Sequence, residues 1–131
     1  MAASALVDLV IGLALLEYFV FGLLVGRARA KFDVPAPASS GHPTFERTFR
    51  AQQNTLEQLI IFVPSMWMFS SLVSAQIAAV LGVVFVIGRA LYFRGYVAEA
   101  SKRGTGFLIS AAAQMTLLIG ALVGAGIKAL G

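Results

Sequence analysis

The sequence predicts an all-α membrane protein in which a single domain, residues 1–131, folds as a bundle of four transmembrane helices. Of the 131 residues, 59% are hydrophobic and 12% are charged, whereas about a quarter of a soluble domain is charged. The charged residues form a few clusters that separate long uncharged runs. Basic residues flank these runs, as the positive-inside rule expects of a protein that crosses a membrane several times.

Four apolar runs are expected to span the bilayer, at residues 5–25, 57–73, 77–96 and 107–130. Each is close to the length of about 20 residues that a helix needs to cross the hydrocarbon core. The first run contains Asp8 and Glu17 and is too long for the apolar core of a signal peptide, so we expect it to be retained. Glu17 lies in the middle of that run and should face other helices.

Several residues mark where the helices should begin and end. Gly26 should end the first helix, because the basic segment after it leads into a proline-rich loop at residues 33–43. Thr44 is expected to be the N-cap of the second helix, which stays polar for three turns before its apolar part begins. Pro64 lies inside that apolar part and should kink the helix.

Two short connections, at residues 74–76 and 98–106, join the remaining helices. In the fourth helix the small residues Gly120, Gly124 and Gly126 should permit close packing. Nearly all the basic residues lie in or beside the first loop and the connection at 98–106. These two connections are therefore expected in the cytoplasm, and the two termini on the opposite side of the membrane. In a bacterium this membrane would be the inner membrane.

The composition argues against several classes of function. The net charge of +4 does not indicate nucleic-acid binding, because the basic residues flank hydrophobic spans. The chain has no cysteine, so it has no disulfide framework, thiolate metal site or cysteine nucleophile. A single histidine, His42, cannot form a metal site, and we expect no metal.

Two polar stripes point to a polar ligand held between helices. Arg50, Asn54 and Glu57 follow an i, i+4, i+7 pattern, which places a cation, an amide and an anion on one helix face. They suit a ligand with carboxylates and an ammonium group, because arginine binds carboxylates in a bidentate manner and glutamate can hold an ammonium. The alternative is an ion pair on the helix surface or a polar cluster that holds helices together.

The second stripe consists of Arg89, Tyr92 and Tyr96, at i, i+3 and i+7 near the end of another apolar run. Tyrosines at such positions are often interfacial residues, although two that share a face with an arginine fit a binding site better. Arg103 follows seven residues after Tyr96, where a guanidinium could hold a ligand thiol as the thiolate. The alternative for Arg103 is a side chain that extends to the membrane interface.

Three segments resemble a known family when they are taken together. They are VGRARAKFDVPAPASSGHPTFER (25–47), FERTFRAQQNTLEQLIIF (45–62) and GRALYFRGYVAEASKRGTGF (88–107). Their order and spacing resemble the MAPEG superfamily, the membrane-associated proteins of eicosanoid and glutathione metabolism. Within that superfamily the resemblance is closest to the branch of microsomal glutathione S-transferase type 2 and leukotriene C synthase.

The resemblance implies a left-handed, MAPEG-like four-helix bundle that assembles as a homotrimer, with glutathione as co-substrate in a cleft between subunits. It implies a set of glutathione contacts within one subunit at Arg50, Asn54, Glu57, Gln58, Tyr92 and Tyr96. Arg29 and Gln52 match the positions that a neighbouring subunit contributes. Gln58 and Gly26 depart from the family pattern, and Gln58 stands where the leukotriene synthase has a tyrosine.

The resemblance also assigns Arg103 to the family arginine that stabilises the glutathione thiolate, and Arg89 to a structural arginine. It implies a glutathione transferase that acts on hydrophobic electrophiles reaching the site from the membrane lipids, with glutathione peroxidase activity toward lipid hydroperoxides as a further expectation. Two alternatives remain open, a non-catalytic lipid-presenting protein like the lipoxygenase-activating branch and a structural or channel-forming trimer.

Overall fold

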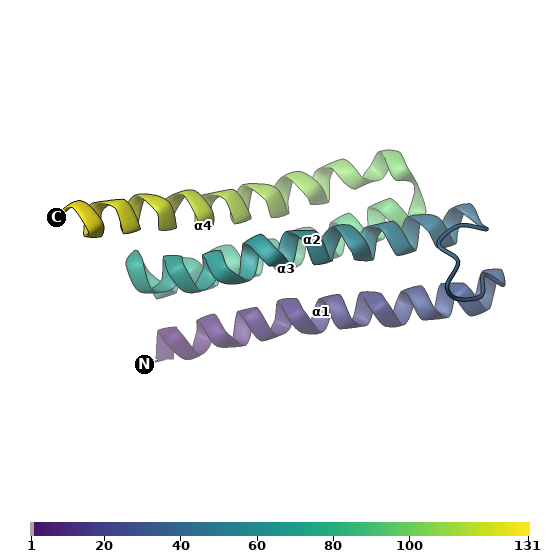
Figure 1. The fold of residues 1–131 in the computed structure, drawn as a ribbon, viewed down its shortest axis with the longest axis horizontal. Helices are drawn as coiled ribbons and strands as arrows, with labels where there is room; N and C mark the ends of the chain where they lie inside the picture. The colour runs from purple at the N-terminus through teal and green to yellow at the C-terminus, as the bar shows by residue number, and fades with distance from the viewer. Residues whose placement is uncertain (1) are drawn as a thin grey trace.

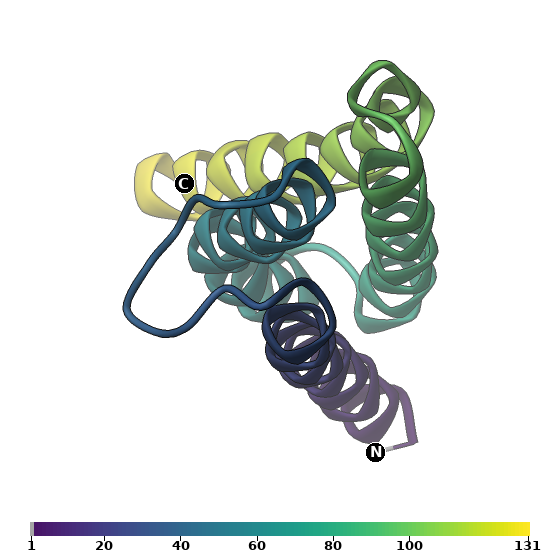
Figure 2. The same ribbon diagram turned by 90° about the vertical axis from the view of Figure 1, so that its right-hand side faces the viewer.

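A computed structural model describes residues 2–131 and shows an all-helical chain, as the sequence predicts. The described residues form four α-helices and one short 3-10 helix: α1 (Ala2–Phe32), α2 (Pro43–Leu72), α3 (Ala75–Ala98), η1 (Ala100–Arg103) and α4 (Gly104–Leu130). The four long helices run roughly side by side (Figure 1), with the two termini at one end and the long loop between α1 and α2 at the other. Viewed from that second end, the loop bridges the ends of α1 and α2 (Figure 2).

Within residues 2–131, three helical segments are long and apolar enough to cross a membrane by length and composition. They are α1, α3 and the segment from Ala100 to Leu130, which joins η1 to α4. The other long helix, α2, falls outside this group because its first three turns are polar and its apolar part covers only residues 57–73. That α2 also spans the bilayer stays a prediction from the sequence.

The predicted end of α1 was wrong by six residues and the predicted N-cap of α2 by two. Gly26 does not end α1, which continues to Phe32 because alanine, arginine and lysine favour a helix and basic side chains suit its carboxyl end. Thr44 is not the N-cap of α2 either. His42 has that role, since its Nδ1 accepts a hydrogen bond from the backbone N–H of Thr44 at 3.1 Å, and Pro43 occupies the first helical position.

Two later boundaries also differ from the sequence prediction. The connection expected at 98–106 is mostly helical, and α4 begins at Gly104 rather than Phe107. Pro64 is accommodated inside a continuous α2. Of the turn expected at 74–76, only Ser74 lies outside the helices, because Ala75 and Gln76 already belong to α3. The Oγ of Ser74 caps α3 by accepting a hydrogen bond from the N–H of Ile77 at 3.2 Å.

The core lies between all four helices. Phe62 of α2 stacks on Phe85 of α3 with ring centroids 3.8 Å apart, and Val10 and Leu117 bring α1 and α4 to the same cluster. Residues with apolar side chains thus fill the interior along the bundle, while polar side chains concentrate nearer the end that carries the long loop.

The closest approach of α3 and α4 depends on Gly88 and Gly106, two glycines that the sequence analysis did not single out. A Cβ on Gly88 would lie 2.6 Å from the backbone N of Ser110, and one on Gly106 would overlap the backbone N of Tyr92. Of the three glycines expected to permit close packing, Gly120 and Gly124 lie against Phe69 and Leu72 at the end of α2, whereas a Cβ on Gly126 would meet nothing within 4 Å. Because Gly106 admits the backbone of Tyr92, this contact fixes the position of a predicted site residue.

Candidate functional site

The two predicted stripes and Arg103 line three adjoining pockets between α2, α3 and the η1–α4 segment. The outer pocket has a volume of about 550 Å³ and is lined by Glu46, Arg47, Arg50, Tyr96 and Ala100, among others. The middle pocket, about 580 Å³, is lined by Asn54, Tyr92, Ser101, Arg103, Gly104 and Phe107. The inner pocket, about 250 Å³, is lined by Asn54, Glu57, Gln58, Arg89, Tyr92 and Phe107.

The middle and inner pockets share lining residues, and the outer pocket lies next to them. Asn54, Tyr92 and Phe107 belong to both the middle and inner pockets. The guanidinium of Arg103 lies over the ring of Tyr96, 5.4 Å from its centroid, and this contact joins the middle pocket to the outer one. The helices therefore bring together predicted site residues as far apart in the sequence as Arg50 and Arg103.

Hydrogen bonding and ring packing fix the two tyrosines. The amide nitrogen of Asn54 donates a hydrogen bond to the hydroxyl of Tyr92 at 2.6 Å. Tyr96 packs edge-on against Tyr92, with ring centroids 5.6 Å apart. Asn54 on α2 and Tyr92 on α3 were predicted in separate stripes, and the structure joins them directly.

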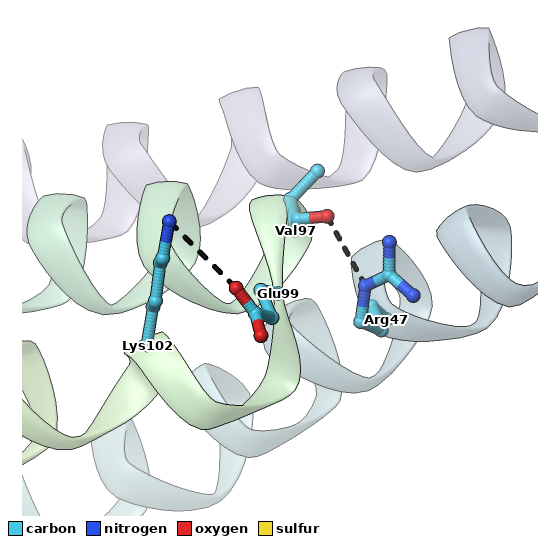
Figure 3. A network of polar contacts seen from close by, with 4 residues as sticks. All are labelled: Arg47, Val97, Glu99 and Lys102. Carbon is cyan, nitrogen blue, oxygen red and sulfur yellow. Dashed lines mark hydrogen bonds and ion pairs between the residues drawn. The ribbon is translucent and has the colours of Figure 1, made fainter.

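Arg50 and Glu57 do not pair with each other. Both side chains are exposed, and the one ion pair within residues 2–131 joins Lys102 to Glu99 at 3.7 Å. Beside that pair, Arg47 Nε donates a hydrogen bond of 3.2 Å to the carbonyl oxygen of Val97 (Figure 3). This bond links α2 to the end of α3. The alternative of a surface ion pair for the first stripe is therefore wrong, and both charges face the pockets without a protein counter-ion.

Arg103 is held at the start of α4 rather than extended away from the bundle. Its Nη1 donates a hydrogen bond to the carbonyl oxygen of Ala100 at 2.5 Å within η1. Its guanidinium lies 5.4 Å from the centroid of the Tyr96 ring, and Arg103 lines the middle pocket. A fixed positive charge therefore borders the same pocket as Asn54 and Tyr92.

Arg89 is buried, with 1% of its surface exposed, and it connects three helices. Its Nη2 donates a hydrogen bond to Thr55 Oγ1 at 3.0 Å, and its Nη1 donates one to Ser110 Oγ at 3.3 Å. The guanidinium also stacks on Tyr92, with Cζ 3.9 Å from the ring centroid. Arg89 therefore positions Tyr92, as expected of a structural arginine, and the sequence signal for its partners was a hydroxyl inside each neighbouring apolar helix.

Gln58 binds a partner that the sequence analysis did not identify. The Nε2 of Gln114 on α4 donates a hydrogen bond to Gln58 Oε1 at 2.8 Å. Gln114 is 3% exposed. Its signal was available in the sequence, because it is the single amide side chain in the fourth apolar run.

Arg29 and Gln52 do not join the three pockets within one subunit. Arg29 lies over the ring of Phe45, and its Nη1 donates a hydrogen bond to the carbonyl oxygen of Ala38 at 2.6 Å in the long loop. Gln52 faces α1, where its Nε2 donates a hydrogen bond to the hydroxyl of Tyr18 at 3.4 Å. Arg29 of α1 thus contacts the loop and the start of α2, and Gln52 of α2 faces α1, so neither lines the pockets that contain Arg50, Asn54 and Glu57.

Comparison with known proteins identifies the family. The sequence profile of the MAPEG family matches residues 7–123. The chain belongs to the MAPEG family. This result confirms the resemblance found in the three sequence segments.

The relatives of this MAPEG protein include the two groups that the sequence indicated. It is 48% identical to microsomal glutathione S-transferase 2 of Homo sapiens, over 78% of this chain and 70% of the relative. It is 38% identical to leukotriene C4 synthase of Mus musculus, over 87% of this chain and 75% of the relative. It is also 46% identical to an uncharacterized protein of a Synechocystis strain, over 88% of this chain and 84% of the relative. Family membership and the apolar helices together make it a membrane protein.

Proposed function

We propose that this MAPEG protein is a membrane-bound glutathione S-transferase that conjugates the glutathione thiol to hydrophobic electrophiles. The observation that carries the proposal is the row of polar side chains along three adjoining pockets, in which Arg50 and Glu57 have no protein counter-ion and Arg103 lines the middle pocket. Relatives named as a glutathione transferase and a leukotriene synthase, at 48% and 38% identity, support it.

The groups that line the pockets complement glutathione chemically. Glutathione carries two carboxylates, one ammonium group and one thiol. Arg50 offers a bidentate partner for a carboxylate, and Glu57 offers a carboxylate for the ammonium group. Asn54 and the hydroxyl groups of Tyr92 and Tyr96 supply neutral hydrogen bonds that orient the peptide between them.

Arg103 is proposed to activate the thiol. A thiol has a pKa of about 8.5 and is mostly protonated at neutral pH, whereas the thiolate is the nucleophile. A guanidinium beside the sulfur favours the thiolate by Coulomb attraction and so lowers the thiol pKa. The thiolate sulfur then attacks the electrophilic carbon, and the leaving group or the developing anion takes up the charge.

The same thiolate could reduce a lipid hydroperoxide, and we include glutathione peroxidase activity in the proposal. The hydrophobic substrate would enter from the lipid, because the pockets lie between helices whose outer faces are apolar. The free charges of Arg50 and Glu57 and the retained Arg103 favour this function over a lipid-presenting protein without catalysis.

We further propose that the protein acts as a homotrimer in which Arg29 and Gln52 approach the pockets of a neighbouring subunit. Their positions support this arrangement, since Arg29 on α1 binds the long loop, Gln52 on α2 binds Tyr18 of α1, and neither lines a pocket of its own subunit. The loop end of the bundle, where the outer pocket lies, is proposed to face the cytoplasm.

The test is a direct one for the purified protein in detergent micelles. Addition of glutathione should produce the ultraviolet absorbance of a bound thiolate at neutral pH. Turnover of a hydrophobic electrophile should then depend on glutathione. A protein that binds glutathione without thiolate absorbance and turns over no electrophile would contradict the transferase proposal.

A further inference from the structure

A further pocket, here called the basic pocket, lies between α3 and the η1–α4 segment and has a volume of about 410 Å³. It shares no lining residue with the three pockets of the proposed glutathione site. Four of its residues lie on α3 at i, i+3, i+4 and i+7, on a helix face roughly opposite that of Tyr92 and Tyr96. The full lining is Leu91, Arg94, Gly95, Ala98, Lys102, Thr105 and Gly106.

Two glycines let the η1–α4 segment approach α3 at the basic pocket. A Cβ on Gly95 would overlap the carbonyl oxygen of Lys102. A Cβ on Gly106 would lie 2.7 Å from the carbonyl carbon of Leu91. Because backbone packs directly on backbone at both glycines, the packing of the two segments fixes the place of the side chains that border the pocket.

Two cations line the basic pocket, and one of them has no counter-ion in the protein. Arg94 is exposed and forms no ion pair within residues 2–131. Lys102 pairs with Glu99 at 3.7 Å (Figure 3), but both side chains are exposed, so solvent and salt weaken this pair. A guanidinium and an ammonium group that line one pocket suit an anion with several oxygen atoms, such as a phosphate group.

An apolar stripe leads from the basic pocket along the outside of α3. It consists of Val80, Val84, Ile87 and Leu91, which are all exposed and share the helix face of Arg94. The helix α3 is long and apolar enough to cross a membrane. A molecule with a phosphate group at Arg94 and a hydrocarbon chain along the stripe would match both parts of this surface, whereas free phosphate would match only the first.

The basic pocket lies where the headgroups of phospholipids are found. The segment η1 joins α3 to α4 at the loop end of the bundle (Figure 1), so the pocket lies at one end of the apolar helices rather than midway along them. Phospholipid headgroups occupy this level, just outside the hydrocarbon core. We have proposed that this end faces the cytoplasm, where the membrane leaflet carries anionic lipids.

We propose that the basic pocket binds the phosphate headgroup of an anionic phospholipid, whose acyl chain lies along the apolar stripe of α3. Arg94 binds the phosphate oxygens in a bidentate manner, and Lys102 adds a second positive charge. A zwitterionic lipid binds more weakly, because its own cation repels both side chains. This inference goes beyond the proposed transferase function and does not depend on it, since none of the lining residues belongs to the glutathione site.

The experiment titrates the purified protein in detergent micelles with phosphatidylglycerol, or with phosphatidylcholine of the same acyl chains, and native mass analysis counts the lipids bound. We expect phosphatidylglycerol to bind more tightly. Arg94→Gln should weaken its binding about fivefold, which is the typical contribution of one basic residue to the binding of anionic lipid. Lys102→Gln should also weaken it, whereas Glu99→Gln should strengthen it, because Lys102 then loses its competing carboxylate.

Arg27→Gln is the matched control, since Arg27 is exposed near the same end of the bundle but lies on α1 and does not line the basic pocket. An equal loss in Arg27→Gln and Arg94→Gln would show a diffuse attraction to the basic end of the protein and overturn the pocket. Equal binding of the two lipids would overturn it as well. Inorganic phosphate in large excess should not displace the lipid, and displacement would make the pocket a site for free phosphate instead.

Discussion

At the scale of single residues, the site combines side chains that are locked in place with charges that remain available. Arg89 is satisfied by Thr55 and Ser110 and supports Tyr92, so its charge is committed to the fold. Arg50 and Glu57 are exposed and face the pockets. A ligand with charges of both signs can therefore bind Arg50 and Glu57 without breaking an ion pair within the protein.

Arg50→Ala should weaken glutathione binding, because it leaves a ligand carboxylate without its bidentate partner. Loss of one member of a charge pair costs about 2–5 kcal/mol when the pair is buried, and less when solvent screens it, as at the open outer pocket. We expect Kd to rise about tenfold, measured by calorimetry at moderate salt. Arg94→Ala removes the same charge from an exposed position outside the three pockets and should leave Kd nearly unchanged, and an equal rise in both variants would place the ligand elsewhere.

The residues of the two stripes could be predicted from the sequence, but their connections could not. Spacing along one helix shows which side chains share a face, and Arg50, Asn54 and Glu57 were found in this way. The bonds from Asn54 to Tyr92 and from Gln114 to Gln58 join different helices, and only the packing of the bundle determines them.

At the scale of helices, the local sequence predicted the order of the elements better than their ends. The helix α1 passes Gly26 because one glycine costs only about 1 kcal/mol in a long helix. The N-cap of α2 was missed because the ring nitrogen of His42 accepts the bond that a serine or threonine oxygen usually accepts. The tight contact between α3 and α4 depends on Gly88 and Gly106, whose partners lie on the other helix.

Gly106→Ala should destabilise the bundle and disturb the site at once, since its Cβ would overlap the backbone of Tyr92. Overpacking of this kind costs about 1–3 kcal/mol. We expect a lower Tm in detergent together with weaker glutathione binding. Gly126→Ala is the control on the same helix, because its Cβ would meet nothing within 4 Å, and it should leave both measurements unchanged or raise Tm slightly. A Gly106→Ala variant with the Tm of wild type would contradict the packing argument.

At the scale of the whole molecule, one subunit leaves two of the predicted site residues outside its own pockets. Large apolar side chains are exposed along α1, among them Leu9, Leu16, Phe19 and Leu23. In a membrane these side chains would meet lipid or another subunit. The sequence could not show which, because hydropathy is the same for both surroundings.

The proposed assembly has a simple test. Native mass analysis in mild detergent should report three chains, because Arg29 and Gln52 would complete the site of a neighbour only in an oligomer. Chemical crosslinking in native membranes provides an independent check of the same number. A monomer that conjugates glutathione at the full rate would show that these two residues have no part in the site.

The central claim is that Arg103 holds the glutathione thiol as the thiolate, and a pH–rate profile tests it most directly. Wild type and Arg103→Ala are compared at saturating glutathione with benzyl chloride, with Lys102→Ala as the control that removes a neighbouring charge from η1. Wild type and the control should share an apparent pKa below the usual thiol value of about 8.5. Arg103→Ala should turn over more slowly at neutral pH, and its rate should approach that of wild type as pH rises, because the solution then supplies the thiolate. If Arg103→Ala has the same profile and the same apparent pKa as wild type, Arg103 does not activate the thiol and the account is wrong.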